Sequence, residues 1–375
     1  MKKLAKILIV VLAVIVVLAA ALWFIPRPAG LWYKQTLSEG YTGAFEKNGA
    51  LDELSYLDLG GHSHPETVLV RDGWVYVSVS GGMLMRMRED GSEHTVLLDT
   101  NGCLLGFAFD AEGRILAADC DYLGTGAVLR VEDDGSGRFD VLLSRDTGMA
   151  LYYPNGFAVA SDGTVYVTDS SSAFPPSHYY GSSSKAAANE GMMHSCTGRV
   201  IALHPDTGEA TVIADGFAFA NGLGLSDDEK TLFVSETYAY DIKRIDLTTG
   251  EVAPFLTNLP GFPDNITKGP DGKFWVGFNG ERSDALDGIS DRPFLRKCLW
   301  IYNKLAAVNE SAAIGYCHVF AFTEDGTVTD SLQSGTNGYY RSTGVAEAPG
   351  GRLYLSSIND VGKLAYVDLV APTAP

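Results

Sequence analysis

The chain has 375 residues, of which 46% are hydrophobic and 20% are charged, so it has ample material for a buried core. Its 28 Lys and Arg against 46 Asp and Glu give a formal net charge of −18, which argues against nucleic acid as a partner because such binding needs a basic surface. The acidic balance suits a soluble surface or a site that collects cations.

The N-terminal segment predicts a membrane anchor. Residues 1–6 read MKKLAK and are basic, and the segment Ile7–Ile25 that follows carries no charge. At about 1.5 Å per residue, a helix of this length spans the ~30 Å core of a bilayer. We therefore expect a cytoplasmic tail over 1–6, a single transmembrane signal-anchor over 7–25, a linker over 26–53 and the rest of the chain on the extracytoplasmic side of the membrane. A cleaved signal peptide is the alternative, because LAAAL offers small residues for cleavage.

Six later segments share one pattern, a tight turn followed by a short strand of apolar and aromatic residues. They are RDGWVYVSVS (71–80), AEGRILAADC (111–120), SDGTVYVTDS (161–170), DEKTLFVSET (228–237), PDGKFWVGFN (270–279) and PGGRLYLSSI (349–358). The Asp-Gly and Gly-Gly dipeptides suit hairpins that need positive φ, and a second hairpin follows most copies. This recurrence predicts an all-β fold, a six-bladed β-propeller over residues 54–370.

The ring also has a candidate closure and two insertions. The last repeat ends with KLAYVDL (363–369) and lacks a fourth strand. We expect LSYLDLG (54–60) to supply the outer strand of the last blade and so remove a free sheet edge. Residues 171–196 are interpreted as a Ser- and Ala-rich loop, and PFLRKCLWIYNKLAAV (293–308) as an amphipathic helix.

The five cysteines of this exported domain cannot all pair within one chain. Cys103 and Cys120 enter and leave one strand pair at nearly the same height, so a disulfide between them is geometrically plausible. Cys298 with Cys317 is a weaker pairing, and Cys196 is then a free thiol.

One position in each repeat enters the innermost strand of its blade. These strands line the central channel of a propeller, so the six side chains should converge on one axis. They are Glu66, Leu105, Asn155, Asn221, Asp264 and Thr343. Singly, an Asn or Asp here would be an ordinary turn residue. Together, however, Glu66, Asn155, Asn221 and Asp264, with Asn265 beside them, form an oxygen-only set that matches Ca²⁺ and disfavours zinc and copper.

Two strings carry a resemblance to a known family. FAFANGLGLSDDEKTLFVSETYAYDIKRI (217–245) and NLPGFPDNITKGPDGKFWVGF (258–278) resemble the strictosidine synthase-like family, which belongs with the paraoxonases and the regucalcin/gluconolactonase enzymes among six-bladed propellers. The resemblance covers residues 61–368. It implies hydrolysis of an ester or lactone over a channel Ca²⁺ held by the residues matching Glu66, Asn155, Asn221, Asp264 and Asn265. Paraoxonases carry a catalytic His where this chain has Leu105, so a His dyad of that type is not expected.

A bound Ca²⁺ that is open toward the channel mouth would polarise an ester carbonyl and stabilise the oxyanion as water attacks. Asp264 and Glu236 are the candidates for the group that takes the proton from this water. Backbone capping and loop solvation are the more usual roles for the other titratable residues at this face, which are Asp119, Asp169, His62 and His64.

The residues predict a calcium site, and the resemblance implies that the protein is a calcium-dependent hydrolase of a small-molecule ester or lactone. Two alternatives stay open, namely a condensing or lyase enzyme on the same fold and a non-catalytic binding module in which Ca²⁺ only staples the channel. Specificity would reside in the loops and insertions above the channel, so the sequence does not identify the substrate.

Overall fold

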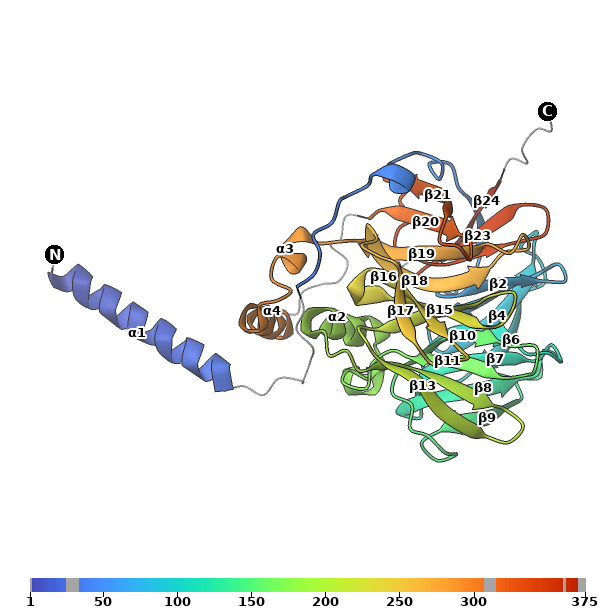
Figure 1. Ribbon diagram of the computed structural model, residues 1–375, viewed down its shortest axis with the longest axis horizontal. Helices are drawn as coiled ribbons and strands as arrows, with labels where there is room; N and C mark the ends of the chain where they lie inside the picture. The colour runs from blue at the N-terminus through green and yellow to red at the C-terminus, as the bar shows by residue number, and fades with distance from the viewer. Residues whose placement is uncertain (1, 25–33, 307–314, 360–361, 370–375) are drawn as a thin grey trace.

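The computed structural model describes residues 2–24, 34–306, 315–359 and 362–369 (Figure 1). Its strands form six four-stranded antiparallel sheets, and the inner strands of neighbouring sheets pack against one another around a common axis. The six-bladed propeller predicted from the repeats is therefore confirmed. The predicted end of the propeller at residue 370, the start of the linker at 26–33 and residue 25 of the anchor lie outside the described residues.

Each blade is one meander, and its first strand lies nearest the axis. Blade 1 comprises β2 Val68–Arg71, β3 Trp74–Val79, β4 Met83–Arg88 and β5 Thr95–Asp99. Blade 2 comprises β6 Leu104–Phe109, β7 Ile115–Tyr122, β8 Thr125–Val131 and β9 Phe139–Ser144. Blade 3 comprises β10 Pro154–Val159, β11 Val165–Asp169, β12 Gly198–His204 and β13 Glu209–Phe217. Blade 4 comprises β14 Ala220–Leu225, β15 Thr231–Glu236, β16 Asp241–Asp246 and β17 Val252–Leu256. Blade 5 comprises β18 Gly261–Lys268, β19 Phe274–Glu281, β20 Cys317–Phe322 and β21 Val328–Ser334.

Blade 6 closes the ring with a strand from the other end of the propeller sequence. It comprises β22 Ser342–Glu347, β23 Arg352–Ser357, β24 Lys363–Asp368 and, as its outer strand, β1 Ser55–Asp58. β1 pairs antiparallel with β24, with Leu57 opposite Leu364. Both leucines are buried in a core that continues into blade 1. The predicted closure by residues 54–60 is confirmed, and it leaves the last blade with four strands like the others.

A bulge interrupts the inner strand of five blades at the same place. The register of β6, β10, β14, β18 and β22 against its partner shifts across two residues, and the first of the two is the axis position predicted from the repeats. The second residue is glycine in four of these strands, and the neighbouring inner strand is the reason. A Cβ on Gly106 would lie 2.1 Å from the carbonyl oxygen of Asn155, and one on Gly222 would lie 2.2 Å from the amide nitrogen of Ile266. Bulges re-aim side chains, and here they turn one residue per blade toward the axis.

The helices lie at one end of the propeller (Figure 1). They are α1 Lys2–Phe24, α2 Ser183–Met193, α3 Asp284–Asp287 and α4 Pro293–Ala306, with the short 3-10 helices η1 Gly43–Phe45, η2 Pro176–Tyr179 and η3 Thr237–Ala239. α4 confirms the helix predicted in the second insertion. The first insertion was predicted to be a loop, and this is wrong over α2, where Ser182 caps an Ala-rich run by accepting a hydrogen bond from the Lys185 amide.

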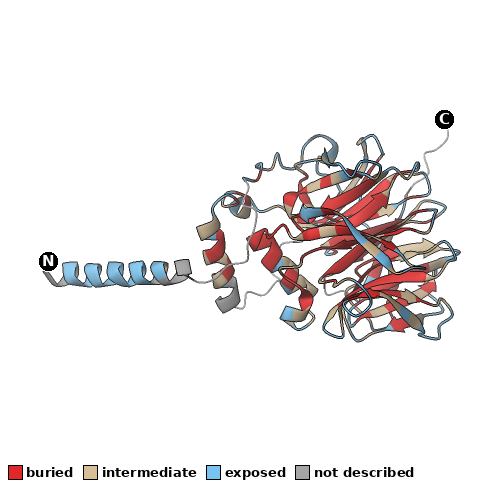
Figure 2. Ribbon diagram, turned by 60° about the horizontal axis from the view of Figure 1, so that its bottom comes forward, coloured by how far each residue is buried: buried red, intermediate tan, exposed pale blue. Residues whose placement is uncertain are grey.

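α1 is helical over nearly the whole segment in which the sequence predicts a membrane anchor. Its described side chains are almost all exposed (Figure 2). Within the described ranges, no helix has both the length and the apolarity that crossing a membrane requires.

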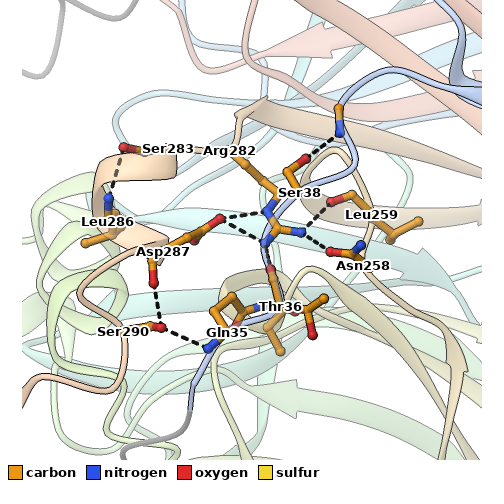
Figure 3. A network of polar contacts seen from close by, with 12 residues as sticks. Gln35, Thr36, Ser38, Asn258, Leu259, Arg282, Ser283, Leu286, Asp287 and Ser290 are labelled. Carbon is orange, nitrogen blue, oxygen red and sulfur yellow. Dashed lines mark hydrogen bonds and ion pairs between the residues drawn. The ribbon is translucent and has the colours of Figure 1, made fainter.

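The segment that follows residue 33 packs on the helical end of the propeller. The Gln35 amide donates to the Ser290 hydroxyl at 2.8 Å, and its side chain donates to the carbonyl of Ala239 at 2.7 Å. Figure 3 shows Arg282 at the centre of this network, where it donates to the carbonyl of Thr36 and pairs with the buried Asp287 at 2.8 Å. The part of the predicted linker that is described is thus bound to blades 4 and 5.

All five cysteines are free thiols. Cys103 and Cys120 are neighbours, as the strand geometry predicts, but the disulfide between them is not formed. The Cys120 thiol points at the carbonyl oxygen of Cys103, 3.2 Å away, and the two backbones are joined by a hydrogen bond of 2.9 Å. The Cys120 sulfur therefore faces the main chain of Cys103 and not its sulfur. The pairing of Cys298 with Cys317 is not formed either.

Candidate metal centre in the channel

A cavity of about 370 Å³ lies on the axis at the helical end of the propeller. All six axis positions line it, namely Glu66, Leu105, Asn155, Asn221, Asp264 and Thr343. The four with carboxylate or amide oxygens come from blades 1, 3, 4 and 5, and each is at most 7% exposed. The bulged inner strands thus bring the predicted oxygen donors to the floor of one cavity.

Hydrogen bonds hold the two carboxylates of this floor. Asp264 accepts from the Asn221 amide at 2.7 Å through one oxygen and from the Asn279 amide at 2.9 Å through the other. Glu66 accepts from the Thr67 hydroxyl at 2.5 Å and from the Asn265 amide at 3.0 Å. Both carboxylates are therefore oriented by neutral donors before any ligand binds.

The electrostatics of the floor are unfavourable for two negative charges. Burial raises the pKa of Glu66, although the hydrogen bonds from Thr67 and Asn265 oppose this shift. Burial and the charge of Glu66 together raise the pKa of Asp264 well above its usual value. Among the described residues, neither carboxylate has an ion-pair partner. The nearest cation of the cavity is Arg341, whose charge partly opposes the rise in the pKa of Asp264 without forming an ion pair with it.

Two further oxygens on the floor have no donor. Within the described residues, the buried side-chain oxygens of Asn155 and Asn221 have no hydrogen-bond partner. The nitrogen of each amide instead donates to a hydroxyl, that of Ser170 for Asn155 and that of Thr237 for Asn221. Buried polar atoms are normally satisfied. Two orphan amide oxygens beside two unpaired carboxylates are what a hard cation such as Ca²⁺ satisfies, so these residues fit that ion. The described part of the chain has no cluster of three or more His, Cys, Asp and Glu side chains that could hold a metal, and this set relies on amides for half its donors.

Asn265 lies on the other side of this floor. It occupies the bulge position that is glycine in four other blades, and it lines a second cavity, of about 530 Å³, on the far side of the inner strands. Its amide reaches Glu66 from there. Asn265 thus orients a carboxylate of the floor and does not line the first cavity.

The carboxylates that close the second strands bind loop backbone. Glu236 accepts from the Ala218 amide at 2.7 Å and lies 3.4 Å from the Lys243 ammonium. Asp119 accepts from the Cys103 amide, and Asp169 from the Tyr153 amide. These three residues hold the loops that lead into the inner strands, and none of them lines the cavity.

Of the two histidines that the sequence places near the channel mouth, one lies beside the cavity. His64 lines a smaller cavity of about 230 Å³ that shares Glu66 and Leu105 with the first, and its ring accepts or donates a hydrogen bond of 2.9 Å with Ser63. His62 lines neither cavity. Leu105 presents an apolar side chain where a His dyad of the paraoxonase type would need an imidazole.

Sequence reasoning missed several residues of the cavity wall. Asn279 closes the second strand of blade 5 and binds Asp264, and Arg341 in turn donates to the Asn279 oxygen at 3.1 Å. The aromatic residues Tyr153, Phe219 and Phe262 also line the cavity. A signal was present, because Arg341 and these aromatic residues stand at a fixed offset from the axis positions.

Comparisons with known proteins agree with the fold. The model of the family described as SMP-30/gluconolactonase/LRE-like region matches residues 68–287, and that of the strictosidine synthase-like N-terminal region matches residues 43–87. The adipocyte plasma membrane-associated protein of Salmo salar is 29% identical over 69% of this chain and 65% of its own length. The protein strictosidine synthase-like 6 of Arabidopsis thaliana is 29% identical over 66% of this chain and 65% of its own length. The chain thus spans just under two thirds of the length of these relatives.

Solved structures share the architecture at lower identity. A gluconolactonase from Xanthomonas campestris superimposes with a TM-score of 0.57 at 21% identity, covering 91% of this chain and 98% of that one. Regucalcin from Agrobacterium tumefaciens, a calcium-binding protein, gives a TM-score of 0.55 at 13% identity, covering 84% and 93%. At these identities the likeness extends to the fold alone.

Proposed function

Because this chain belongs to the SMP-30/gluconolactonase/LRE-like family, we propose that it is a Ca²⁺-dependent hydrolase of small-molecule esters or lactones. The proposal depends on one observation above all. The buried oxygens of Glu66, Asn155, Asn221 and Asp264 form the floor of a cavity of about 370 Å³ rather than a closed plug. A site that only stapled the channel would have no use for this space.

The floor residues would hold the ion, and Asn265 would orient Glu66 toward it. When bound, Ca²⁺ supplies positive charge that polarises a carbonyl and stabilises the developing oxyanion. Asp264 is the carboxylate in position to take the proton from water, because it faces the cavity and its oxygens accept from Asn221 and Asn279. Glu236 does not line the cavity, and its carboxylate is held by Ala218 and Lys243, so we do not assign this role to it.

The N-terminal helix would anchor this enzyme to a membrane, with the propeller on the extracytoplasmic side. Two observations support this part of the proposal. The segment Ile7–Ile25 is uncharged behind a basic tail, and the Salmo salar relative is named as plasma membrane-associated.

The test is a panel of aryl esters and lactones, assayed with added Ca²⁺ and with chelator. We expect hydrolysis that chelator removes and Ca²⁺ restores, and that Asp264→Asn abolishes. Asn221→Ala should weaken Ca²⁺ binding, measured by calorimetry, while the protein remains folded. Calcium binding without hydrolysis of any substrate in the panel would instead favour the non-catalytic module.

A further inference from the structure

A second ring of side chains lies above the metal floor, which is the cavity floor formed by Glu66, Asn155, Asn221 and Asp264. The residue two positions before each axis position lines either the main cavity or the smaller cavity beside it. From blade 1 to blade 6 these residues are His64, Cys103, Tyr153, Phe219, Phe262 and Arg341. The chemical character of these six side chains changes around the channel. Blades 3, 4 and 5 contribute aromatic side chains, whereas blade 6 contributes a cation.

The aromatic half is a continuous and fixed surface. The ring centroids of Tyr153 and Phe219 are 5.1 Å apart, those of Phe219 and Tyr238 are 5.4 Å apart, and those of Tyr238 and Phe262 are 5.7 Å apart. All four residues line the cavity. The Tyr153 hydroxyl donates to the carbonyl of Ser183 at 2.9 Å, which ties the wall to α2. The three contacts are edge-to-face, with interplanar angles of 87°, 65° and 73°, so the wall offers both ring faces and ring edges to a flat apolar group.

Arg341 lines the same cavity as this wall, and most of its guanidinium makes no hydrogen bond with the described residues. Its Nε donates to the Asn279 oxygen at 3.1 Å, and this is the one hydrogen bond that its side chain makes among the described residues. Asn279 separates Arg341 from Asp264, since its amide donates to Asp264 at 2.9 Å. Arg341 therefore does not form an ion pair with the metal floor, and its terminal nitrogens remain available to a ligand in the cavity.

The backbone at Arg341 indicates that the side chain is held there at a cost. Its φ is +58°, in the left-handed region that glycine adopts without strain. At the same place in blades 4 and 1, Phe219 and His64 have φ of +70° and +55°. Strained positions of this kind are associated with ligand sites, and three of the six positions in this ring have that backbone conformation.

We propose that Arg341 is a substrate-recognition residue that binds a carboxylate, and that the substrate is a flat, largely aromatic ester or lactone that also carries a carboxylate group. The aromatic part stacks on the wall from blades 3–5, and the planar guanidinium matches the carboxylate in a forked hydrogen bond. Calling this ligand a substrate rests on the proposed hydrolase function. Its binding by Arg341 and the aromatic wall does not depend on any reaction.

The test is therefore a binding measurement with a pair of ligands that cannot be hydrolysed under the assay. 2-Naphthoate and 2-naphthamide have nearly the same shape and differ in charge. We expect the full chain, titrated in calcium buffer, to bind naphthoate about tenfold or more tightly than naphthamide, as is typical when a charged group gains its hydrogen bonds. Arg341→Gln and Arg341→Gly should bring the ratio close to one and leave naphthamide affinity nearly unchanged.

Two features of the design keep the result decisive. Arg341→Gly suits the positive φ, so a loss of preference in this variant does not come from backbone strain. Arg244→Gln removes an exposed positive charge from β16 and should keep the naphthoate preference. A preference that survives both Arg341 variants, or its absence from the wild-type protein, would overturn the proposal. Failure of the ester and lactone panel would count against hydrolysis and leave this binding result standing.

Discussion

Replacing Gly222 with alanine tests whether the close approach of the inner strands builds the metal floor. A Cβ at this position would lie 2.2 Å from the amide nitrogen of Ile266 and 2.6 Å from the carbonyl oxygen of Asp264, where ordinary contact begins at 3.4 Å. Both obstacles are backbone atoms, so no change of side-chain rotamer relieves them. β14 and β18 must move apart by roughly 1 Å. Overpacking costs about 1–3 kcal/mol, and we expect the upper end because two backbones must shift.

The same movement should weaken the site. The hydrogen bond of 2.7 Å from the Asn221 amide to Asp264 joins these two strands directly beside Gly222. When the strands separate, this bond lengthens and two of the four floor residues lose their mutual orientation. Loss of such support around metal ligands typically lowers affinity by about 10–100-fold. We therefore expect Gly222→Ala to lose Ca²⁺ affinity as well as stability.

Thermal unfolding in chelator and calorimetric Ca²⁺ titration measure the two effects separately. At about 2.1 cal/mol/K of unfolding entropy per residue, a cost of about 3 kcal/mol corresponds to a fall of about 4–5 °C in the unfolding midpoint of a propeller of this size. Gly362→Ala is the matched control, because Gly362 is exposed, its φ lies outside the left-handed region, and a Cβ there would be 3.6 Å from the nearest atom, the carbonyl oxygen of His62. The control should change neither quantity. A Gly222→Ala protein with a wild-type midpoint and wild-type Ca²⁺ affinity would refute this account of the channel.

Three further predictions concern the charges of the site. Asp264→Asn should stabilise the metal-free protein at neutral pH. Burial and Glu66 raise the pKa of Asp264, so the folded state holds this proton more tightly than the unfolded chain, and the stability present at low pH is lost as the pH rises through the folded-state pKa. Unfolding midpoints in chelator should consequently favour the variant more at high pH than at low pH, and a constant difference would contradict this. Glu236→Gln should keep hydrolysis nearly unchanged, because a glutamine oxygen still accepts a hydrogen bond from the Ala218 amide. It should lower the free energy of unfolding by about 1 kcal/mol, because the contact with the Lys243 ammonium is lost. Loss of hydrolysis in this variant would show that Glu236 is catalytic. Chelation of the wild-type protein should lower its unfolding midpoint, since Ca²⁺ at 100 times its Kd contributes about 2.7 kcal/mol by mass action, and an unchanged midpoint would show that the ion does not bind.

The repeats made the fold predictable, because the same turn and strand pattern recurs six times. The position of a residue within each copy also predicts which side chain points toward the channel axis. The first insertion was harder. Its Ser-rich start and single Pro pair are typical of a loop, whereas α2 forms where Ser182 caps the Ala-rich run and Met192 and Met193 pack into a small core. Tertiary packing of this kind is not visible in local sequence. The predicted disulfide was wrong for a related reason. Strand pairing brings the backbones of Cys103 and Cys120 together but does not direct their sulfurs toward each other.

The orientation of Asn265 was predictable in principle. In four blades the axis residue is followed by glycine, namely Gly106, Gly156, Gly222 and Gly344, because the next inner strand leaves little or no room for a side chain. Asn265 stands at this second position, and its side chain accordingly lines the far cavity. Reading the repeat as a pair of positions, one facing the site and one facing away, separates the floor residues from those that support them.

The departures from six-fold repetition also indicate how a substrate would lie. Blades 2 and 6 place Leu105 and Thr343 at the axis, so the carboxylate and amide floor is contributed by blades 1, 3, 4 and 5. In the ring above, the aromatic wall spans blades 3–5 and Arg341 stands in blade 6. If the proposed function is right, a ligand that packs on the wall and reaches Arg341 with its carboxylate passes over blade 5, where the wall ends beside blade 6. Asp264 lies there, joined to Arg341 through Asn279. The bond between the aromatic and anionic parts of the substrate is therefore the one brought over the residue proposed to activate water.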